Sequence, residues 1–242
     1  MIKKYLSYLY SRTAEDSTRY FLSLFESKPD AKVLDCGCWD GANTLKYGKI
    51  IGTKEVYGIE IDKLKAKEAE KKGVKVKVGN LNEKLPFQSN AFDAVAAYHV
   101  IEHLVNARGF AAEMNRVLKK NGYVVIGTPN LASWHNILAL LIGVQPFSGP
   151  TIMPNYESEV SVVKNMNKKR LKDVFSGEEA ESLEHIKVMT LKALISLLKA
   201  NKFRIENAKG FGYYPLFPLL SKPLSLLDPY HSHYVIVKAR KI

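Results

Sequence analysis

The fold is decided by the stretch Val33-Leu34-Asp35-Cys36-Gly37-Cys38-Trp39-Asp40-Gly41-Ala42-Asn43-Thr44. Its pattern predicts a buried strand that ends at an acidic residue and passes through a Gly-x-x-x-Gly turn into a helix. Glycine permits positive φ and lets backbone N–H groups approach a ligand closely, and the start of the helix adds unpaired donors. A turn of this kind is suited to holding a nucleotide-like ligand.

The glycine spacing restricts which ligand can bind. A dinucleotide fingerprint needs Gly-x-Gly-x-x-Gly, so that a pyrophosphate can lie on the helix N-terminus. Here Trp39 stands two positions after Gly37, and an indole leaves no room for a pyrophosphate. Asp35, separated from Gly37 by one residue, would repel a phosphate but suits a cationic amine or a sulfonium.

A second short apolar run, 56–60, ends in the carboxylate of Glu60. Glu60 follows Gly41 by 19 residues, which is the separation expected for one helix and a return strand. From that position Glu60 can accept hydrogen bonds from both hydroxyls of a ribose. The alternative interpretation is a solvated acid at the end of a strand.

Strand and helix patterns alternate over much of the chain, which predicts an α/β fold with a doubly wound, mostly parallel sheet. We expect strands at about 32–36, 55–60, 74–78, 92–97, 122–127, 203–208 and 234–239. We expect helices at about 42–50, 62–72, 106–119, 131–144 and 190–200, the last with Thr190 as its N-cap.

The run 33–130 resembles the class I S-adenosylmethionine-dependent methyltransferases, in particular the group that includes the ubiquinone-biosynthesis O-methyltransferases (methyltransferase types 11 and 23). The matching pieces are VLDCGCWDG at 33–41, VYGIEID at 56–62, GNLNEKLPF at 79–87, FDAVAAYHVIEHL at 92–104 and LKKNGYVVIGTPN at 118–130. The resemblance continues more loosely to the last strand. It implies a Rossmann-like sheet of seven strands in the order 3-2-1-4-5-7-6, with the seventh antiparallel.

The resemblance also implies a set of residues that bind S-adenosyl-L-methionine. They are Asp35, Gly37, Cys38, Gly41, Glu60, Ile61, Asn80, Leu81 and Tyr98. Two positions depart from the family pattern. Trp39 stands where glycine is commonest, and it either walls the methionine end of the pocket or covers the first strand. Asn80 replaces the acid that usually contacts the adenine amino group, and its side-chain oxygen can still accept that hydrogen.

Methyl transfer requires alignment of the reactants, and it requires a base when the acceptor carries a proton. His99 is the candidate base because it directly follows the fourth strand. The alternative is a histidine that only packs beside the cofactor. Glu102 and His103 share a helical face with His99 and offer a divalent-metal set, but a structural hydrogen-bond network is the favoured interpretation, and no metal is assigned.

The acceptor is narrowed by motifs that are absent. The segment Ala97-Tyr98-His99-Val100 replaces the Asp/Asn-Pro-Pro-aromatic motif of base-modifying amino-methyltransferases, and it lacks the cysteine used to attack pyrimidines. We therefore expect O-methylation of a small-molecule, lipid or glycan acceptor. An RNA methyltransferase that uses the basic surface (net charge +12) and a non-catalytic cofactor-binding homologue stay as alternatives.

The 242 residues are expected to form one methyltransferase domain. It would comprise an N-terminal helical segment (1–30), a lid insertion (131–184, mobile over 145–184) and an apolar insertion (211–227). Aromatic residues of the insertions could cover an acceptor or form a homodimer contact: Trp134, Phe147, Tyr156, Phe211, Tyr213, Tyr214 and Phe217. Two buried thiols, no signal segment and no apolar run of roughly 20 residues favour a cytoplasmic protein without a transmembrane segment.

Overall fold

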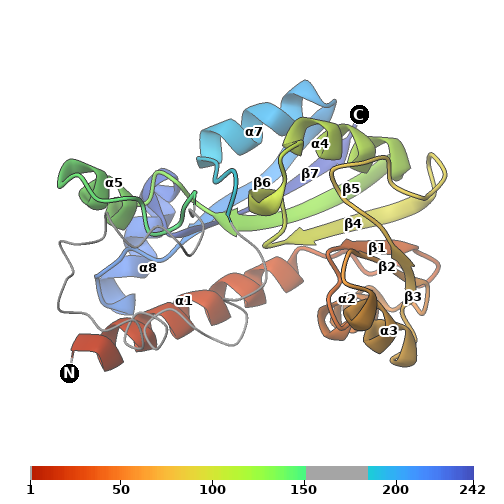
Figure 1. The fold of residues 1–242 in the computed structure, drawn as a ribbon, viewed down its shortest axis with the longest axis horizontal. Coiled ribbons are helices and arrows are strands. Elements are labelled where there is room, and N and C mark those ends of the chain that lie inside the picture. The colour runs from red at the N-terminus through yellow and green to blue at the C-terminus, as the bar shows by residue number, and fades with distance from the viewer. Residues whose placement is uncertain (1, 151–184) are drawn as a thin grey trace.

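A computed structural model describes residues 2–150 and 185–242 (Figure 1). Its strands are β1 (Val33–Cys36), β2 (Val56–Glu60), β3 (Lys75–Val78), β4 (Phe92–Tyr98), β5 (Leu118–Pro129), β6 (Phe203–Phe211) and β7 (Tyr234–Lys241). Its helices are α1 (Ile2–Ser23), α2 (Ala42–Ile51), α3 (Lys63–Lys71), α4 (Ala107–Val117), α5 (Trp134–Leu141), α7 (Leu191–Ala200) and α8 (Pro218–Leu227). Two short 3₁₀ helices, η1 (Ile101–His103) and η3 (Pro229–His231), complete the described elements.

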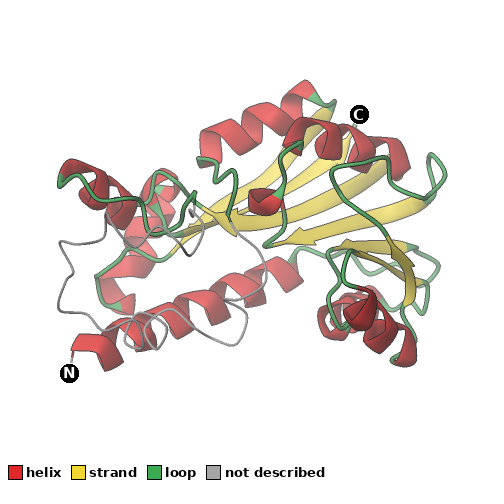
Figure 2. Ribbon diagram, viewed as in Figure 1, coloured by secondary structure: helices red, strands yellow, loops and turns green. Residues whose placement is uncertain are grey.

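The strands form one seven-stranded sheet in the order β3-β2-β1-β4-β5-β7-β6 (Figure 2). All neighbouring strands run parallel except β7, which is antiparallel to both β5 and β6. The predicted fold class, strand order and antiparallel seventh strand are therefore confirmed.

Helices cover both faces of the sheet because buried strands alternate their side chains between two cores. Leu34 and Val95 pack in the core beneath α4 and α7, whereas Val33 and Ala94 pack in the core that α1 and α2 cover. Figure 1 shows α4 and α7 on one side of the sheet and α1 on the other. The carboxyl ends of β1, β2, β4 and β5 all reach the same edge of the sheet.

The strands β5 and β6 extend furthest beyond the ranges that their sequence patterns predicted. β5 begins at Leu118, not near residue 122, because Leu118 leaves α4 directly and pairs with Phe92. β6 continues to Phe211, the first residue of the expected apolar insertion, because it pairs with Tyr234 of β7. Most of the expected lid, 151–184, lies outside the described residues, and α5 occupies part of its first segment.

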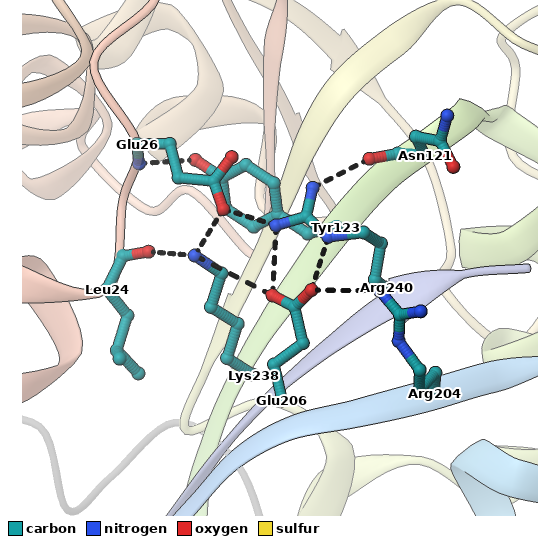
Figure 3. Close-up of polar contacts among 8 residues, drawn as sticks. All are labelled: Leu24, Glu26, Asn121, Tyr123, Arg204, Glu206, Lys238 and Arg240. Atoms are coloured by element: carbon teal, nitrogen blue, oxygen red, sulfur yellow. Dashed lines mark hydrogen bonds and ion pairs between the residues drawn. The ribbon is translucent and has the colours of Figure 1, made fainter.

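An ion-pair network joins the segment after α1 to the last two strands (Figure 3). The Nζ atom of Lys238 donates to the Leu24 carbonyl at 2.8 Å and to Glu26 Oε1 at 2.6 Å. Arg240 binds both Glu26 and Glu206. Lys238 is buried, so this network holds the end of α1 at a fixed place on the sheet.

No helix among the described residues is long and apolar enough to cross a bilayer.

Candidate functional site

The turn after β1 places three left-handed residues at alternate positions. Gly37, Trp39 and Gly41 have φ values of 75°, 47° and 77°. A Cβ at Gly37 would lie 2.7 Å from Val100 Cγ2, and one at Gly41 would lie 2.9 Å from the Cβ of Ala69. Both glycines are therefore required by backbone conformation and by space. The left-handed backbone at Trp39 costs about 1–2 kcal/mol, which explains why glycine is usual there in the family that the sequence resembles.

The Trp39 side chain does not cover the first strand as a buried aromatic. Its residue is 39% exposed, and the Nζ atom of Lys65 lies 5.0 Å from the ring centroid. Beneath the turn, Cys38 is buried against β2, where a Cβ at Gly58 would come within 2.4 Å of its Sγ atom. Burial raises the pKa of the Cys38 thiol, so Cys38 is an unreactive packing residue.

Glu60 fixes the shape of this turn. Its Oε2 atom accepts the Trp39 N–H at 2.8 Å, and Oε1 accepts the N–H groups of Ile61 and Asp62 at 2.9 and 3.0 Å. The residue is only 6% exposed, so it is not the solvated acid of the alternative interpretation. Ile61, by contrast, is exposed beside it.

Asp35 supplies a second buried carboxylate at the same edge. The Thr44 hydroxyl donates to its Oδ2 atom at 2.6 Å. Burial raises the pKa of Asp35 to about 8. The hydrogen bond from Thr44 lowers this pKa in part, and the negative charge of Glu60 raises it further. Within the described part of the chain, no lysine or arginine forms an ion pair with Asp35. A cationic ligand would favour its ionised form, so this pair of acids fits a sulfonium and ammonium cofactor.

Asn80 and Leu81 follow β3. The Oδ1 atom of Asn80 already accepts two hydrogens from Asn82, from the backbone N–H at 3.0 Å and from Nδ2 at 3.2 Å. An adenine amino group would have to share or replace one of these donors. Leu81 is half-buried and packs against the core.

Tyr98 connects the end of β4 to α1. Its hydroxyl forms hydrogen bonds with Ser17 Oγ at 3.1 Å and Thr18 Oγ1 at 3.0 Å. Its ring centroid lies 4.6 Å from that of Phe21. Burial raises the pKa of Tyr98, so the hydroxyl is neutral. Helix α1 therefore forms one wall of the site, which the sequence pattern did not reveal.

His99 and Glu102 form a hydrogen-bonded pair after β4. His99 has a φ of 54°, and its N–H donates to the Gly127 carbonyl at 2.8 Å. Its Nδ1 atom lies 3.2 Å from Glu102 Oε1, and Thr128 Oγ1 donates to Glu102 Oε2 at 3.0 Å. Burial raises the pKa of Glu102, but the hydrogen bond and charge of His99 outweigh it and hold this pKa below its usual range. An ionised carboxylate only accepts, so Nδ1 of His99 is the donor of this hydrogen bond, and in the neutral ring Nε2 would be the atom with the free lone pair.

The possible metal ligands differ from the set considered on sequence. Glu102, His103 and His185 place one ligand atom each within 4.8 Å of one another, and His99 is not in this group. His99 reaches this group only through its hydrogen bond to Glu102, at 3.2 Å, whereas His103 packs on His185 with ring centroids 4.9 Å apart. His185 Nδ1 lies 2.7 Å from the Ser148 carbonyl.

A cluster of rings lies beside His99 and comes from distant parts of the chain. Tyr234 has its ring centroid 5.1 Å from that of His99 and 4.1 Å from that of His233. His233 Nδ1 is 3.1 Å from His135 Nε2. In the described residues, His135 Nδ1 and His233 Nε2 are buried without a hydrogen-bond partner. These two ring nitrogens are therefore unsatisfied polar atoms in the interior of the cluster.

Of the aromatic residues expected around an acceptor, Tyr214 belongs to this cluster, with its ring 5.1 Å from that of His233. Phe147 approaches it through His135, 6.0 Å away. Trp134 instead stacks on His231 at 4.7 Å, and Tyr156 lies outside the described residues. Sequence reasoning missed His233 and Tyr234, because only the antiparallel pairing of β7 with β5 brings them to this edge.

Comparison with known proteins agrees with this geometry. The model of the methyltransferase domain family matches residues 34–126. Demethylmenaquinone methyltransferase of Staphylococcus aureus is 30% identical over 193 residues, which cover 74% of this chain and 78% of that protein. An uncharacterised methyltransferase of Schizosaccharomyces pombe is 34% identical over 134 residues, which cover 50% of this chain and 48% of its own length. The chain thus spans about half the length of that relative.

Solved structures show the same fold. An S-adenosylmethionine-dependent methyltransferase from Mesorhizobium loti has a TM-score of 0.60 at 13% identity, covering 92% of this chain and 96% of its own. One from Aquifex aeolicus has a TM-score of 0.56 at 16% identity, covering 93% and 89%. With the family model, the relatives and the sheet order in agreement, the chain belongs to the class I S-adenosylmethionine-dependent methyltransferases.

Proposed function

We propose that this enzyme methylates a hydroxyl group of a small-molecule, lipid or glycan acceptor. The observation that carries the proposal is the pair of His99 with the buried Glu102, because an oriented imidazole is useful where the acceptor must lose a proton. S-adenosylmethionine, when bound, supplies a methyl group on a positively charged sulfur.

The cofactor would lie along the turn after β1. Asp35 and Glu60 would complement its positive charge and its ribose, and the backbone of Gly37, Cys38 and Gly41 would allow close approach. The remaining proposed contacts are Ile61, Asn80, Leu81 and Tyr98. Each lies at or just beyond the carboxyl end of a strand, where open α/β sheets bind their ligands.

The proton would leave the acceptor through His99. Nε2 of His99 would take up the hydroxyl proton as the acceptor oxygen is methylated. Glu102 would stabilise the resulting imidazolium through Nδ1–H, and Thr128 would keep the carboxylate in place. His99 is suited to this role because its side chain is 33% exposed, whereas Glu102 is fully buried.

The acceptor would lie against the rings beside His99. Tyr234 packs beside His99, and the half-buried rings of Tyr214 and His233 follow it, so aromatic side chains lie next to the proposed base, as is typical of sites for small molecules. The name of the Staphylococcus aureus relative points to a small-molecule acceptor as well. We also propose a cytoplasmic location.

The test combines methyl transfer with cofactor binding. A cell extract incubated with wild-type enzyme and labelled cofactor should show the label in extractable small molecules. His99→Ala should lower kcat by about 10² while cofactor affinity stays nearly unchanged. His231→Asn is the matched control, because His231 contacts Asp228 and Trp134 instead of the site. Label in RNA, or full activity of His99→Ala, would contradict the proposal.

A further inference from the structure

A cavity of about 410 Å³ lies between α1, the end of β6 and α8. Among the described residues that line it, Tyr214 alone also belongs to the ring cluster beside His99. The helices and the strand are neighbours in Figure 1. The residues of α1 that line it, among them Leu9, Thr13, Asp16 and Tyr20, recur every three or four positions and so share one face of the helix. Its volume is in the range of small-molecule sites.

The interior of this cavity is apolar with a few satisfied hydroxyls. Leu9, Tyr213, Ser221 and Ser225 line it and are all buried. Ser221 Oγ accepts the Tyr213 N–H at 2.8 Å, and Ser225 Oγ donates to the Ser221 carbonyl at 2.8 Å. These hydroxyls have partners already, so the interior suits a hydrocarbon or aromatic body more than a polar one.

The charged groups that line the cavity are mostly cations. Arg12 pairs with Glu15 at 2.9 Å, while Lys222 and Arg19 approach Asp16 at 3.1 and 3.9 Å. These arginines and lysines are therefore at least partly compensated by nearby carboxylates.

Lys209 differs from the other cations of the lining. Its Nζ atom lies over two rings, 4.7 Å from the Tyr20 centroid and 5.4 Å from that of Phe211. No carboxylate of the described residues forms an ion pair with it, and the residue is half-buried at the cavity wall. A cation held on aromatic faces without an anionic partner is available to an anionic ligand.

The geometry points to a second ligand site in this cavity for an amphipathic anion. The apolar or aromatic body would fill the space between α1 and α8, and a carboxylate or phosphate head group would bind Lys209. The ligand is a free small molecule or the head group and chain of one lipid, since both present the same chemistry.

The test is calorimetric titration of the full chain with octyl phosphate below its micelle concentration, with octanol as the neutral analogue. We expect saturable binding of one octyl phosphate per chain and at least fivefold weaker binding of octanol. Lys209→Met should weaken octyl phosphate binding about tenfold, the scale for losing a charged partner. Lys192→Met is the matched control, because Lys192 also lies over a tyrosine ring, that of Tyr230, outside the cavity.

Two further variants separate the cavity from the general basic surface. Leu226→Glu places a carboxylate at a cavity position that is 65% exposed, so it should abolish binding without disturbing the fold. Ser225→Phe should fill the cavity, with cofactor binding as the check that it folds. Absent binding, equal binding of octanol, or full binding by Lys209→Met or Leu226→Glu would overturn the inference.

Vesicles of phosphatidylglycerol distinguish the two sources of the ligand. Sedimentation of wild-type protein with vesicles, lost in Leu226→Glu, would identify a lipid as the occupant, whereas octyl phosphate binding alone would identify a free amphipathic anion. Vesicle binding that persists in Leu226→Glu, without octyl phosphate binding, would place the interaction on the surface and overturn the cavity site. Because His99→Ala should bind octyl phosphate normally, this result is independent of the proposed methyl transfer.

Discussion

Replacing Glu102 by glutamine tests the proposed base most directly, because the change removes a charge and keeps the shape. Glu102 is fully buried, and its Oε1 atom lies 3.2 Å from His99 Nδ1. Two unit charges about 4 Å apart interact by about 4 kcal/mol at an effective dielectric constant near 20. Since the His99 side chain is 33% exposed, solvent screens part of this energy and leaves about 2–3 kcal/mol. We therefore expect Glu102→Gln to lower kcat by about 10².

The assay is the pH dependence of kcat for Glu102→Gln, with Thr128→Val as a partner variant. The pKa of Glu102 is lowered, so its charge is present at neutral pH and is lost only as the pH falls through that lowered value. In Glu102→Gln the acidic limb of the profile should move to lower pH, because the imidazolium has lost its anionic neighbour. Thr128→Val removes one hydrogen bond but no charge, and should cost about tenfold. Activity of Glu102→Gln within threefold of wild type, with an unmoved limb, would refute the reasoning.

Three other predictions concern the cofactor and the stability of the fold. Glu60→Gln should weaken S-adenosylmethionine binding by about 1.5–3 kcal/mol by calorimetry, and unchanged affinity in a folded variant would remove Glu60 from the site. Burial raises the pKa of Glu26, but the hydrogen bonds and charges of Lys238 and Arg240 outweigh burial, so the pKa of Glu26 is lowered. The ion pair therefore stabilises the folded state at neutral pH, and this stabilisation is lost as the pH falls through the lowered pKa. In Lys238→Met the melting temperature should therefore fall less steeply as the pH is lowered. Superimposable plots of melting temperature against pH for wild type and variant would disprove this prediction. Burial lowers the pKa of His135 to about 4, so the folded state takes up the His135 proton only at a lower pH than the unfolded state does. The unfolding free energy should fall by up to about 3 kcal/mol between about pH 6.5 and 4 in urea titrations, less steeply in His135→Phe.

The sheet could be predicted because each strand has a recognisable local sequence pattern. Apolar runs such as 33–36 and 92–97 end at turn signals, and the helices between them show their apolar period. Strand ends were less accurate where pairing, instead of local pattern, decides them. Leu118 is an example, because it leaves a helix and enters β5 without any turn residue between them.

The site was predictable where chemistry follows directly from a strand end. Asp35 and Glu60 could be placed because parallel strands bring their carboxyl ends to one edge. Their hydrogen bonds could not, since the Trp39 N–H that Glu60 accepts is presented by a left-handed turn. The role of Glu102 was hidden for the same reason. The spacing of Glu102 from His99 suggested that both lie on one face of a helix. The left-handed φ of His99 shows instead that the backbone at His99 is not helical.

Helix α1 shows what periodicity can and cannot establish. Its spacing indicates which residues share a face, but not what each face meets. Ser17 and Thr18 meet Tyr98, about 80 residues away in sequence, and so join α1 to the proposed methyl-transfer site. Asp16 and Tyr20 lie on another face and line the cavity with β6 and α8. Because both faces belong to one helix that the network around Lys238 fixes to the sheet, a ligand in the cavity and the end of β4 contact the same rigid element.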